Sequence, residues 1–147
     1  MRIRKATPAD GERVLDIWRA AVDATHHFLT TTDRREIEVE VVTFLPQASL
    51  WLAVDSNDLP VGFMLLEEDR LEGLFIHPQD RGSGVGRALV QLALSYTPDL
   101  TTEVNEQNAQ ALGFYKHLGF ERIGRSEKDG QGRSYPLIRM RLASTRK

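Results

Sequence analysis

The stretch from residue 71 to residue 104 constrains the fold more than any other part of the sequence. A β-strand is predicted at 71–76 ("LEGLFI"), a helix at about 84–95, and a second strand at 99–104 ("DLTTEV"). The inward side of the helix is formed by four apolar residues: Val85, Leu89, Leu92 and Ala93. Because a helical crossover lets two strands pair in parallel, 71–76 and 99–104 are predicted to be neighbours in one sheet.

The rest of the chain alternates in the same way between predicted strands and helices. Further helices are expected after Thr7, at 33–45 and at 108–119, and further strands at 3–6, 49–54, 60–68, 120–127 and 134–142. The pattern indicates one α/β domain over 1–147. It predicts a mixed central sheet of about six to seven strands flanked by about four helices, with "STRK" (144–147) as a loose tail.

Three glycines at alternate positions, Gly82, Gly84 and Gly86, lie just before and at the start of the helix predicted at 84–95. A helix N-terminus leaves about four backbone N–H groups without intrahelical partners and carries partial positive charge. Glycines there permit positive φ and remove the Cβ atoms that would keep a phosphate away. Arg81 and Arg87 add charge at the rim. This loop therefore predicts an anion site.

The spacing of these glycines excludes two common nucleotide motifs. A nucleotide-binding loop of the form G-x-x-x-x-G-K-[ST] needs a lysine followed by a hydroxyl residue, and neither follows here. A dinucleotide fingerprint G-x-G-x-x-G needs glycine where Arg87 stands.

Charge and cysteine content exclude further classes. The net charge of −2 argues against a duplex-binding protein, so no nucleic-acid partner is expected. The absence of cysteine excludes disulfides, cysteine zinc sites and cysteine nucleophiles. No apolar run approaches the ~20 residues of a membrane span, and no signal peptide precedes the first strand. A cytoplasmic protein with no membrane partner is expected.

Two motifs together resemble the GNAT N-acetyltransferases. "RGSGVG" is similar to their [QR]-x-x-G-x-[GA] loop, and "NEQNAQALGFYKHLGFERIGR" is similar to their closing motif. The resemblance covers essentially the whole chain, and "VDATHHFL" and "PVGFMLL" resemble one branch of small bacterial members. It implies the GNAT fold and acetyl-CoA as co-substrate. The family's pyrophosphate-binding loop corresponds to Arg81, Gly82, Ser83, Gly84, Val85, Gly86 and Arg87, and its pantetheine-pairing strand to Leu74, Phe75 and Ile76.

The closing motif supplies a second group of candidate residues. Asn108 and Tyr115 are seven residues apart on one helix, so they share a face. By resemblance, Asn108 contacts the pantetheine arm, Asn105 contacts the arm or the acceptor, and the Tyr115 hydroxyl protonates the departing thiolate. The alternative is that Asn108 only caps the helix and Tyr115 is only a core aromatic.

Each of the two central strands carries a glutamate that could deprotonate the acceptor amine. Glu72 and Glu103 are these candidates, acting directly or through water, and a water chain without a dedicated base is the alternative. Glu72 alternates along its strand with the same period as Leu74 and Ile76, so it is expected to share their face. Gly73 is a candidate bulge whose freed N–H would polarise the thioester carbonyl.

The acceptor side is assigned to "DATHHFLTTTD" (23–33), because this region lines the acceptor pocket in the family that the chain resembles. His26, His27 and Phe28 are the candidates for substrate binding, and either histidine is a candidate to contact or deprotonate the amine, because a histidine titrates near neutral pH. Alternatively, this segment only closes a helix and joins the core. The spacing of the four histidines does not suit a metal site, so no metal is expected.

The function expected from the sequence is acetyl transfer from acetyl-CoA directly to a primary amine in a ternary complex. The acceptor is a small molecule or a protein, and the sequence does not choose between them. The alternatives are an acyl-CoA sensor without turnover and an RNA-modifying acetyltransferase, which the negative net charge disfavours. The resemblance allows a homodimer, although no apolar stripe requires one.

Overall fold

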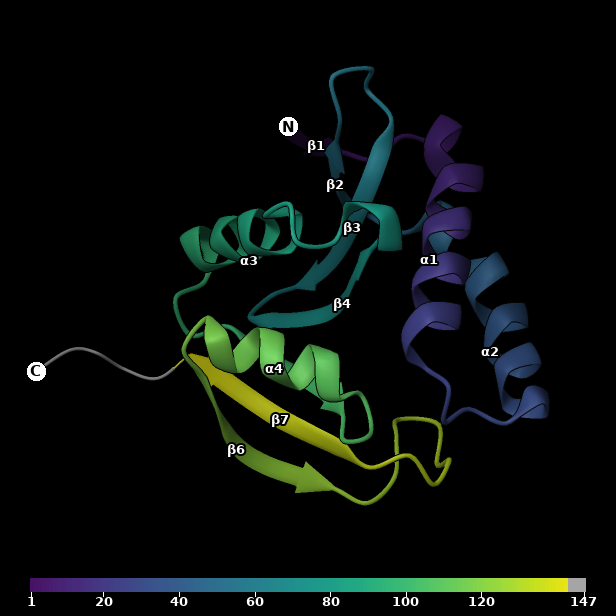
Figure 1. Ribbon diagram of the computed structural model, residues 1–147, viewed down its shortest axis with the longest axis vertical. Coiled ribbons are helices and arrows are strands. Elements are labelled where there is room, and N and C mark those ends of the chain that lie inside the picture. The colour runs from purple at the N-terminus through teal and green to yellow at the C-terminus, as the bar shows by residue number, and fades with distance from the viewer. Residues whose placement is uncertain (143–147) are drawn as a thin grey trace, which may run out of the picture.

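The computed structural model describes residues 1–142 (Figure 1), and the tail expected at 144–147 lies outside them. The described part contains a seven-stranded mixed sheet in the order β1-β2-β3-β4-β5-β7-β6. The strands are β1 (Arg2–Lys5), β2 (Trp51–Val54), β3 (Pro60–Glu67), β4 (Arg70–Ile76), β5 (Thr101–Asn105), β6 (Phe120–Ser126) and β7 (Leu137–Leu142). The helices are α1 (Gly11–Thr25), α2 (Thr31–Phe44), α3 (Val85–Tyr96) and α4 (Ala109–His117). The predicted number of strands and helices is confirmed.

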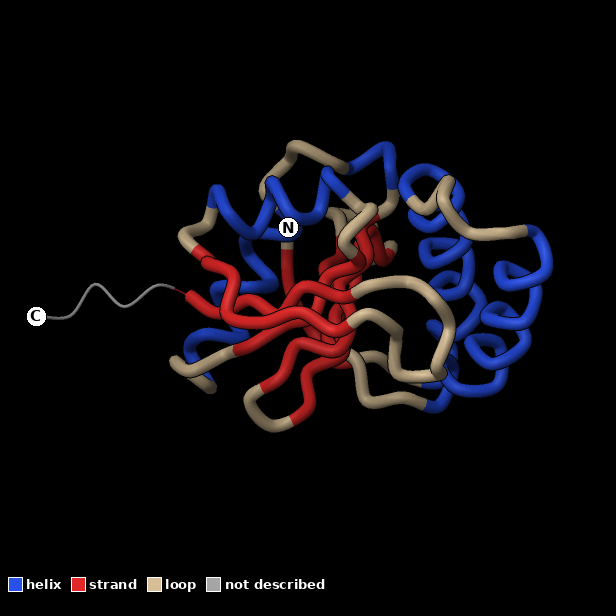
Figure 2. Tube along the Cα trace, turned by 90° about the horizontal axis from the view of Figure 1, so that it is seen from below, coloured by secondary structure: helices blue, strands red, loops and turns tan. Residues whose placement is uncertain are grey.

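Helices cover both faces of the sheet (Figures 1 and 2). The apolar side chains of α1 pack with one set of strand residues, which includes Leu52 and Phe63. Those of α3 and α4 pack with the alternate set, which includes Ala53 and Met64. Because successive strand side chains point to opposite faces, this division places α1 with α2 on one side and α3 with α4 on the other.

The predicted parallel pairing of the two central strands is present but very short. Only Arg70 with Thr101 and Leu71 with Thr102 are paired between β4 and β5. Beyond these residues β4 continues to pair with β3 as far as Ile76, while β5 continues to pair with β7. The centre of the sheet therefore opens between the C-terminal ends of β4 and β5.

A β-bulge lies at Glu72, next to the glycine at which the sequence suggested one. Leu65 pairs with Gly73 and Leu66 with Leu71, so Glu72 is the extra residue in β4. The predicted face of Glu72 is therefore wrong. Leu71, not Glu72, joins the core cluster against which Leu74 and Ile76 pack, because one added residue inverts the alternation of the strand.

The first helix begins in two steps rather than directly after Thr7. A 3₁₀ turn spans Pro8–Asp10 and leads into α1. The carboxylate of Asp10 accepts from the guanidinium of Arg4 at 2.9 and 3.0 Å, and from the backbone N–H of Thr7 at 2.8 Å. These bonds lower the pKa of Asp10 to about 2, with Arg4 as the largest cause, and tie β1 to the start of α1.

Asp10→Asn is expected to lower the free energy of unfolding at pH 7 by about 1–3 kcal/mol, because it breaks a charge-assisted pair at a buried position. The native pKa of Asp10 is depressed, so its contribution is present above pH ~4 and is lost as the pH falls toward about 2. Urea unfolding from pH 7 to pH 2 measures both effects. The control is Asp58→Asn, which removes an exposed partner of Arg4 and should cost less. Equal losses in the two variants would contradict the assignment.

Candidate active site

A cleft of about 510 Å³ lies where β4 and β5 separate. It reaches the end of α1, the start of α3 and one face of α4. Most of the residues singled out in the sequence line it: His26, Glu72, Leu74, Phe75, Ile76, Arg81, Gly82, Gly84, Val85, Gly86, Arg87, Glu103, Asn105, Asn108 and Tyr115. Three of the predicted residues, His27, Phe28 and Ser83, are not part of the lining.

Two of the three glycines are required by the backbone of the loop. Gly82 has φ +79° and Gly84, the N-cap of α3, has φ +87°. Residues with a side chain rarely adopt a positive φ, whereas a Cβ at either position would meet open space. The backbone conformation, and not a lack of room, therefore favours glycine. Between them, the hydroxyl of Ser83 donates to the carbonyl of Asp80 and so helps to shape the turn.

Gly86 has a different role from the one expected. It lies in the first turn of α3 and, unlike Gly82 and Gly84, does not have a positive φ. A Cβ there would come within 3.0–3.1 Å of the Phe114 ring. The absence of a side chain at Gly86 thus lets α3 and α4 approach each other along the cleft.

The N-terminus of α3 presents unpaired donors to the cleft. The first helical hydrogen bond runs from the N–H of Ala88 to the carbonyl of Gly84, so the N–H groups of Val85, Gly86 and Arg87 have no intrahelical acceptor. The positive end of the helix dipole lies at the same place, and the side chains of Arg81 and Arg87 also line the cleft. This end of the cleft suits a phosphate or diphosphate.

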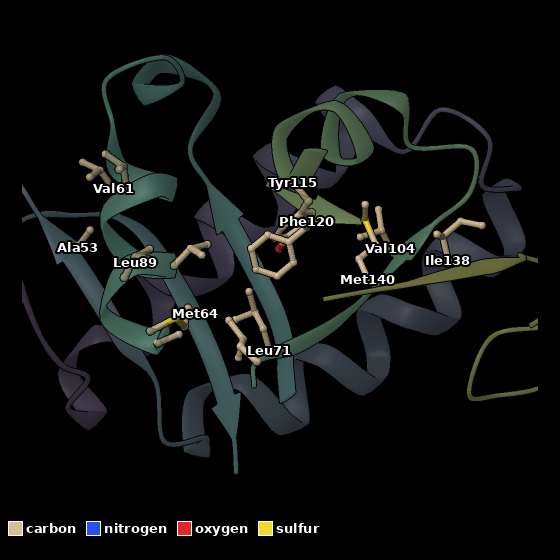
Figure 3. Close-up of a cluster of buried hydrophobic side chains, with 14 residues drawn as sticks. Ala53, Val61, Met64, Leu71, Leu89, Val104, Tyr115, Phe120, Ile138 and Met140 are labelled. Carbon is tan, nitrogen blue, oxygen red and sulfur yellow. The ribbon is translucent and has the colours of Figure 1, made fainter. Parts of the chain in front are cut away.

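Asn108 and Tyr115 both have structural partners and both line the cleft. The Asn108 side chain caps α4 by accepting from the N–H of Ala111 at 3.1 Å. The Tyr115 ring meets the Phe120 ring edge-on, with centroids 5.4 Å apart (Figure 3). It also meets the Phe114 ring edge-on, with centroids 5.0 Å apart. Burial raises the pKa of Tyr115 well above its usual value, and a hydrogen bond with the Thr102 side chain lowers that pKa by a smaller amount. The phenol is therefore protonated at neutral pH and can donate a hydrogen bond.

Asn105 ends β5 and organises the turn into α4. Its side-chain oxygen accepts from the N–H of Gln107 at 2.9 Å, and its carbonyl accepts from the N–H of Asn108 at 2.9 Å. Both oxygens are used within the turn, so the side-chain NH₂ group is the part of Asn105 available to a ligand.

The two glutamates come together around arginine side chains. The Arg70 guanidinium lies 3.4 Å from Glu72 and 3.9 Å from Glu103, and Arg139 lies 3.7 Å from the second oxygen of Glu103. The neighbours of Glu103 in β5, Thr102 and Val104, are buried. Glu103 therefore points to the opposite face of the sheet from them.

The segment after α1 places only one of its two histidines in the cleft. His26 lines the cleft, whereas His27 is exposed and its Nε2 lies 3.0 Å from the carbonyl of Ala24. Phe28 lies between two rings, 5.2 Å from that of His26 and 5.9 Å from that of Tyr135. Phe28 thus supports the His26 side of the cleft from behind.

Tyr135 is a residue that the sequence did not single out. Its hydroxyl donates to the carboxylate of Asp33 and accepts from the N–H of Thr30 at 3.2 Å, which joins the loop before β7 to the start of α2. Arg133 of the same loop lies 3.5 Å from Glu36. These contacts span about a hundred residues, so no local pattern signals them.

Phe114 also lines the cleft, beside Tyr115, and was not among the predicted site residues although it stands within the closing motif.

Residues 1–142 hold no group of three or more histidine or acidic side chains arranged for a metal ion. Over the same residues, none of the helices is long and apolar enough to cross a membrane.

Comparison with known proteins identifies the family. The protein-family model described as acetyltransferase (GNAT) domain matches residues 19–143. The peptidyl-lysine N-acetyltransferase YjaB of Escherichia coli is 54% identical over 138 residues, covering 94% of each chain. YjaB of Salmonella typhimurium is 51% identical over 140 residues, covering 95% of this chain and 97% of the relative. The solution structure of apo YjaB from E. coli superposes with a TM-score of 0.94 over 98% of both chains, at 51% identity. The chain therefore belongs to the GNAT acetyltransferase family and is an acyltransferase.

Proposed function

We propose that this enzyme transfers acetyl from acetyl-CoA directly to the ε-amine of a lysine side chain in a protein. The observation that carries the proposal is the opening of the sheet between β4 and β5. The cleft there is lined from one face of the sheet by α3 and α4, and from the other by the end of α1. Two substrates can meet in it from opposite sides without a covalent enzyme intermediate.

The α3 side suits the donor. The N–H groups of residues 85–87 and the side chains of Arg81 and Arg87 bind the pyrophosphate of coenzyme A. The edge of β4 from Leu74 to Ile76 faces the cleft, since its other edge pairs with β3 and β5 has already diverged. Its backbone groups bind the amides of the pantetheine arm, together with Asn105 and Asn108.

Tyr115 supplies the proton that the leaving thiolate needs. Its phenol is protonated at neutral pH, lines the cleft and is held by Phe114 and Phe120. General acid assistance of this kind contributes ~10²–10⁴ in rate. The bulge next to Gly73 lies on the same stretch of β4, and a backbone N–H there would polarise the thioester carbonyl.

The other face suits a cationic acceptor. Glu72 and Glu103 line the cleft and attract an ammonium group, and both already interact with arginine cations. The relatives named peptidyl-lysine N-acetyltransferases, at 51% and 54% identity, favour lysine over the other primary amines.

Gly84→Asp is expected to weaken acetyl-CoA binding at least about tenfold, because a carboxylate then faces the diphosphate. Gly84→Asn is the matched control, since asparagine has the same size and tolerates positive φ equally well but carries no charge. Titration calorimetry with acetyl-CoA measures both affinities. Equal affinities in the two variants would mean that the diphosphate binds elsewhere.

Tyr115→Phe is expected to reduce kcat by ~10²–10⁴ while acetyl-CoA affinity stays near that of the wild type, because only the hydroxyl is lost. Thiol release with a lysine peptide as acceptor measures kcat, and calorimetry measures affinity. Unchanged turnover would remove the acid role. A wild-type protein that binds acetyl-CoA but acetylates no lysine peptide or small amine would instead be the acyl-CoA sensor.

A further inference from the structure

His26 occupies a distinctive place at the end of α1. It caps the helix, its backbone N–H donates to the carbonyl of Val22 at 2.7 Å, and its side chain lines the cleft. α1 packs on the face of the sheet opposite to α3 and α4, which carry the glycine loop and Tyr115. His26 is therefore on the side from which the acceptor enters under the proposed function, on which this inference rests.

The hydrogen bonds of Thr25 define which imidazole nitrogen carries the proton. The Thr25 hydroxyl donates its single hydrogen to the carbonyl of Ala21 at 2.8 Å, one helical turn back. The same oxygen lies 2.7 Å from Nδ1 of His26 and has only lone pairs left to offer it. Nδ1 must therefore be the donor, so in the neutral ring Nε2 is unprotonated. The hydrogen bonds found within residues 1–142 leave Nε2 unengaged.

The orientation of the ring is supported from outside the cleft. Phe28 packs against the His26 ring, and Tyr135 packs against Phe28. Tyr135 is itself buried and is bonded to Thr30 and Asp33 at the start of α2. This series of contacts holds the loop after α1 against the loop before β7, and with it the imidazole.

We infer that His26 is the general base of the reaction, with Nε2 taking a proton from the lysine ammonium, and that Thr25 is a positioning residue that fixes the tautomer. Glu72 and Glu103 then bind the ammonium electrostatically and do not remove its proton. Their carboxylates are engaged by Arg70 and Arg139, whereas Nε2 is free to accept.

The surroundings of His26 favour the neutral form of its imidazole, which is the form that can accept a proton. Burial lowers the pKa of His26, and the charge of His27 lowers it further. Glu72 and Glu103 line the same cleft as His26. Asp23, on the last turn of α1, pairs with Arg34, and Asp33 accepts from Tyr135, which packs on the far side of Phe28. At neutral pH the imidazole is therefore ready to accept a proton.

His26 and Tyr115 together account for every proton that moves in the reaction. Nε2 takes one proton from R–NH₃⁺, and the free amine attacks the thioester carbon. As the C–N bond forms and the C–S bond breaks, Tyr115 gives its proton to the sulfur. The amide nitrogen loses its second proton to the Tyr115 oxygen through water, and His26 releases its proton to solvent. The products are the N-acetyl-lysine, coenzyme A thiol and one proton.

The first test compares wild type and His26→Gln across pH with acetyl-CoA and a lysine peptide. We expect kcat/KM of the variant to fall about 10²-fold at pH 7. The deficit should shrink as the pH approaches ~10, because the acceptor amine then arrives deprotonated. A rate like that of the wild type, or a deficit of the same size at every pH, overturns the base assignment.

The second test addresses the tautomer through Thr25. Thr25→Val keeps the shape but removes the oxygen, and should lower kcat at least about tenfold with little change in KM. Thr25→Ser restores the hydroxyl and should recover the activity of the wild type. If serine does not rescue, or if valine leaves kcat unchanged, the positioning role is wrong.

The third measurement is independent of turnover. Nitrogen-15 NMR of the imidazole in the wild-type protein at pH 7 should show a protonated Nδ1 and an unprotonated Nε2 for His26. The opposite tautomer, or a charged ring, overturns the inference. A wild-type protein that gives the expected spectrum but acetylates no lysine peptide contradicts the proposed function, and with it the base role, but leaves the hydrogen-bond assignment standing.

Discussion

The structure depends on one interrupted pairing, the two-residue contact between β4 and β5. Arg70 and Leu71 are paired with β5, and then the bulge at Glu72 changes the course of β4. An unpaired strand edge inside a sheet leaves backbone groups that need partners. Here that edge forms the wall of the cleft, which makes it a place for an extended ligand with amide groups. The same bulge directs Leu71 to the core and frees Glu72 for the cleft.

The two faces of the sheet divide the chemistry between them. On the α3 and α4 side, backbone N–H groups and two arginines suit phosphate, and a buried tyrosine holds its proton tightly. On the α1 side, carboxylates and a histidine of lowered pKa suit a cationic amine. Under the proposed function, proton donor and proton acceptor stand on opposite sides of the thioester. Such separation keeps the two groups from exchanging their proton directly, and each keeps the protonation state that its role requires.

Several residues illustrate how structural and chemical roles coincide. Asn108 caps α4 and Tyr115 belongs to the core, and each also lines the cleft. A side chain fixed by a cap or by aromatic neighbours is held in one geometry, which is what a bound cofactor requires. The alternatives posed at Asn108 and Tyr115 are therefore not exclusive. Gly86 shows the reverse, because its missing side chain serves the packing of α3 against Phe114 rather than the conformation of the loop.

The sequence by itself determined the order of strands and helices, the parallel pairing of the central strands, the glycine loop and its family. These follow from local periodicity, turn residues and motifs that lie within a few residues of one another. Only the tertiary structure decided that a bulge reverses the face of Glu72, that His26 rather than His27 enters the cleft, and that Tyr135 reaches α2. The physical reason is that each depends on side chains distant in sequence: the pairing with β3, the packing of α1, and a hydrogen bond across 102 residues. Local patterns specify the elements, while the contacts between them specify the site.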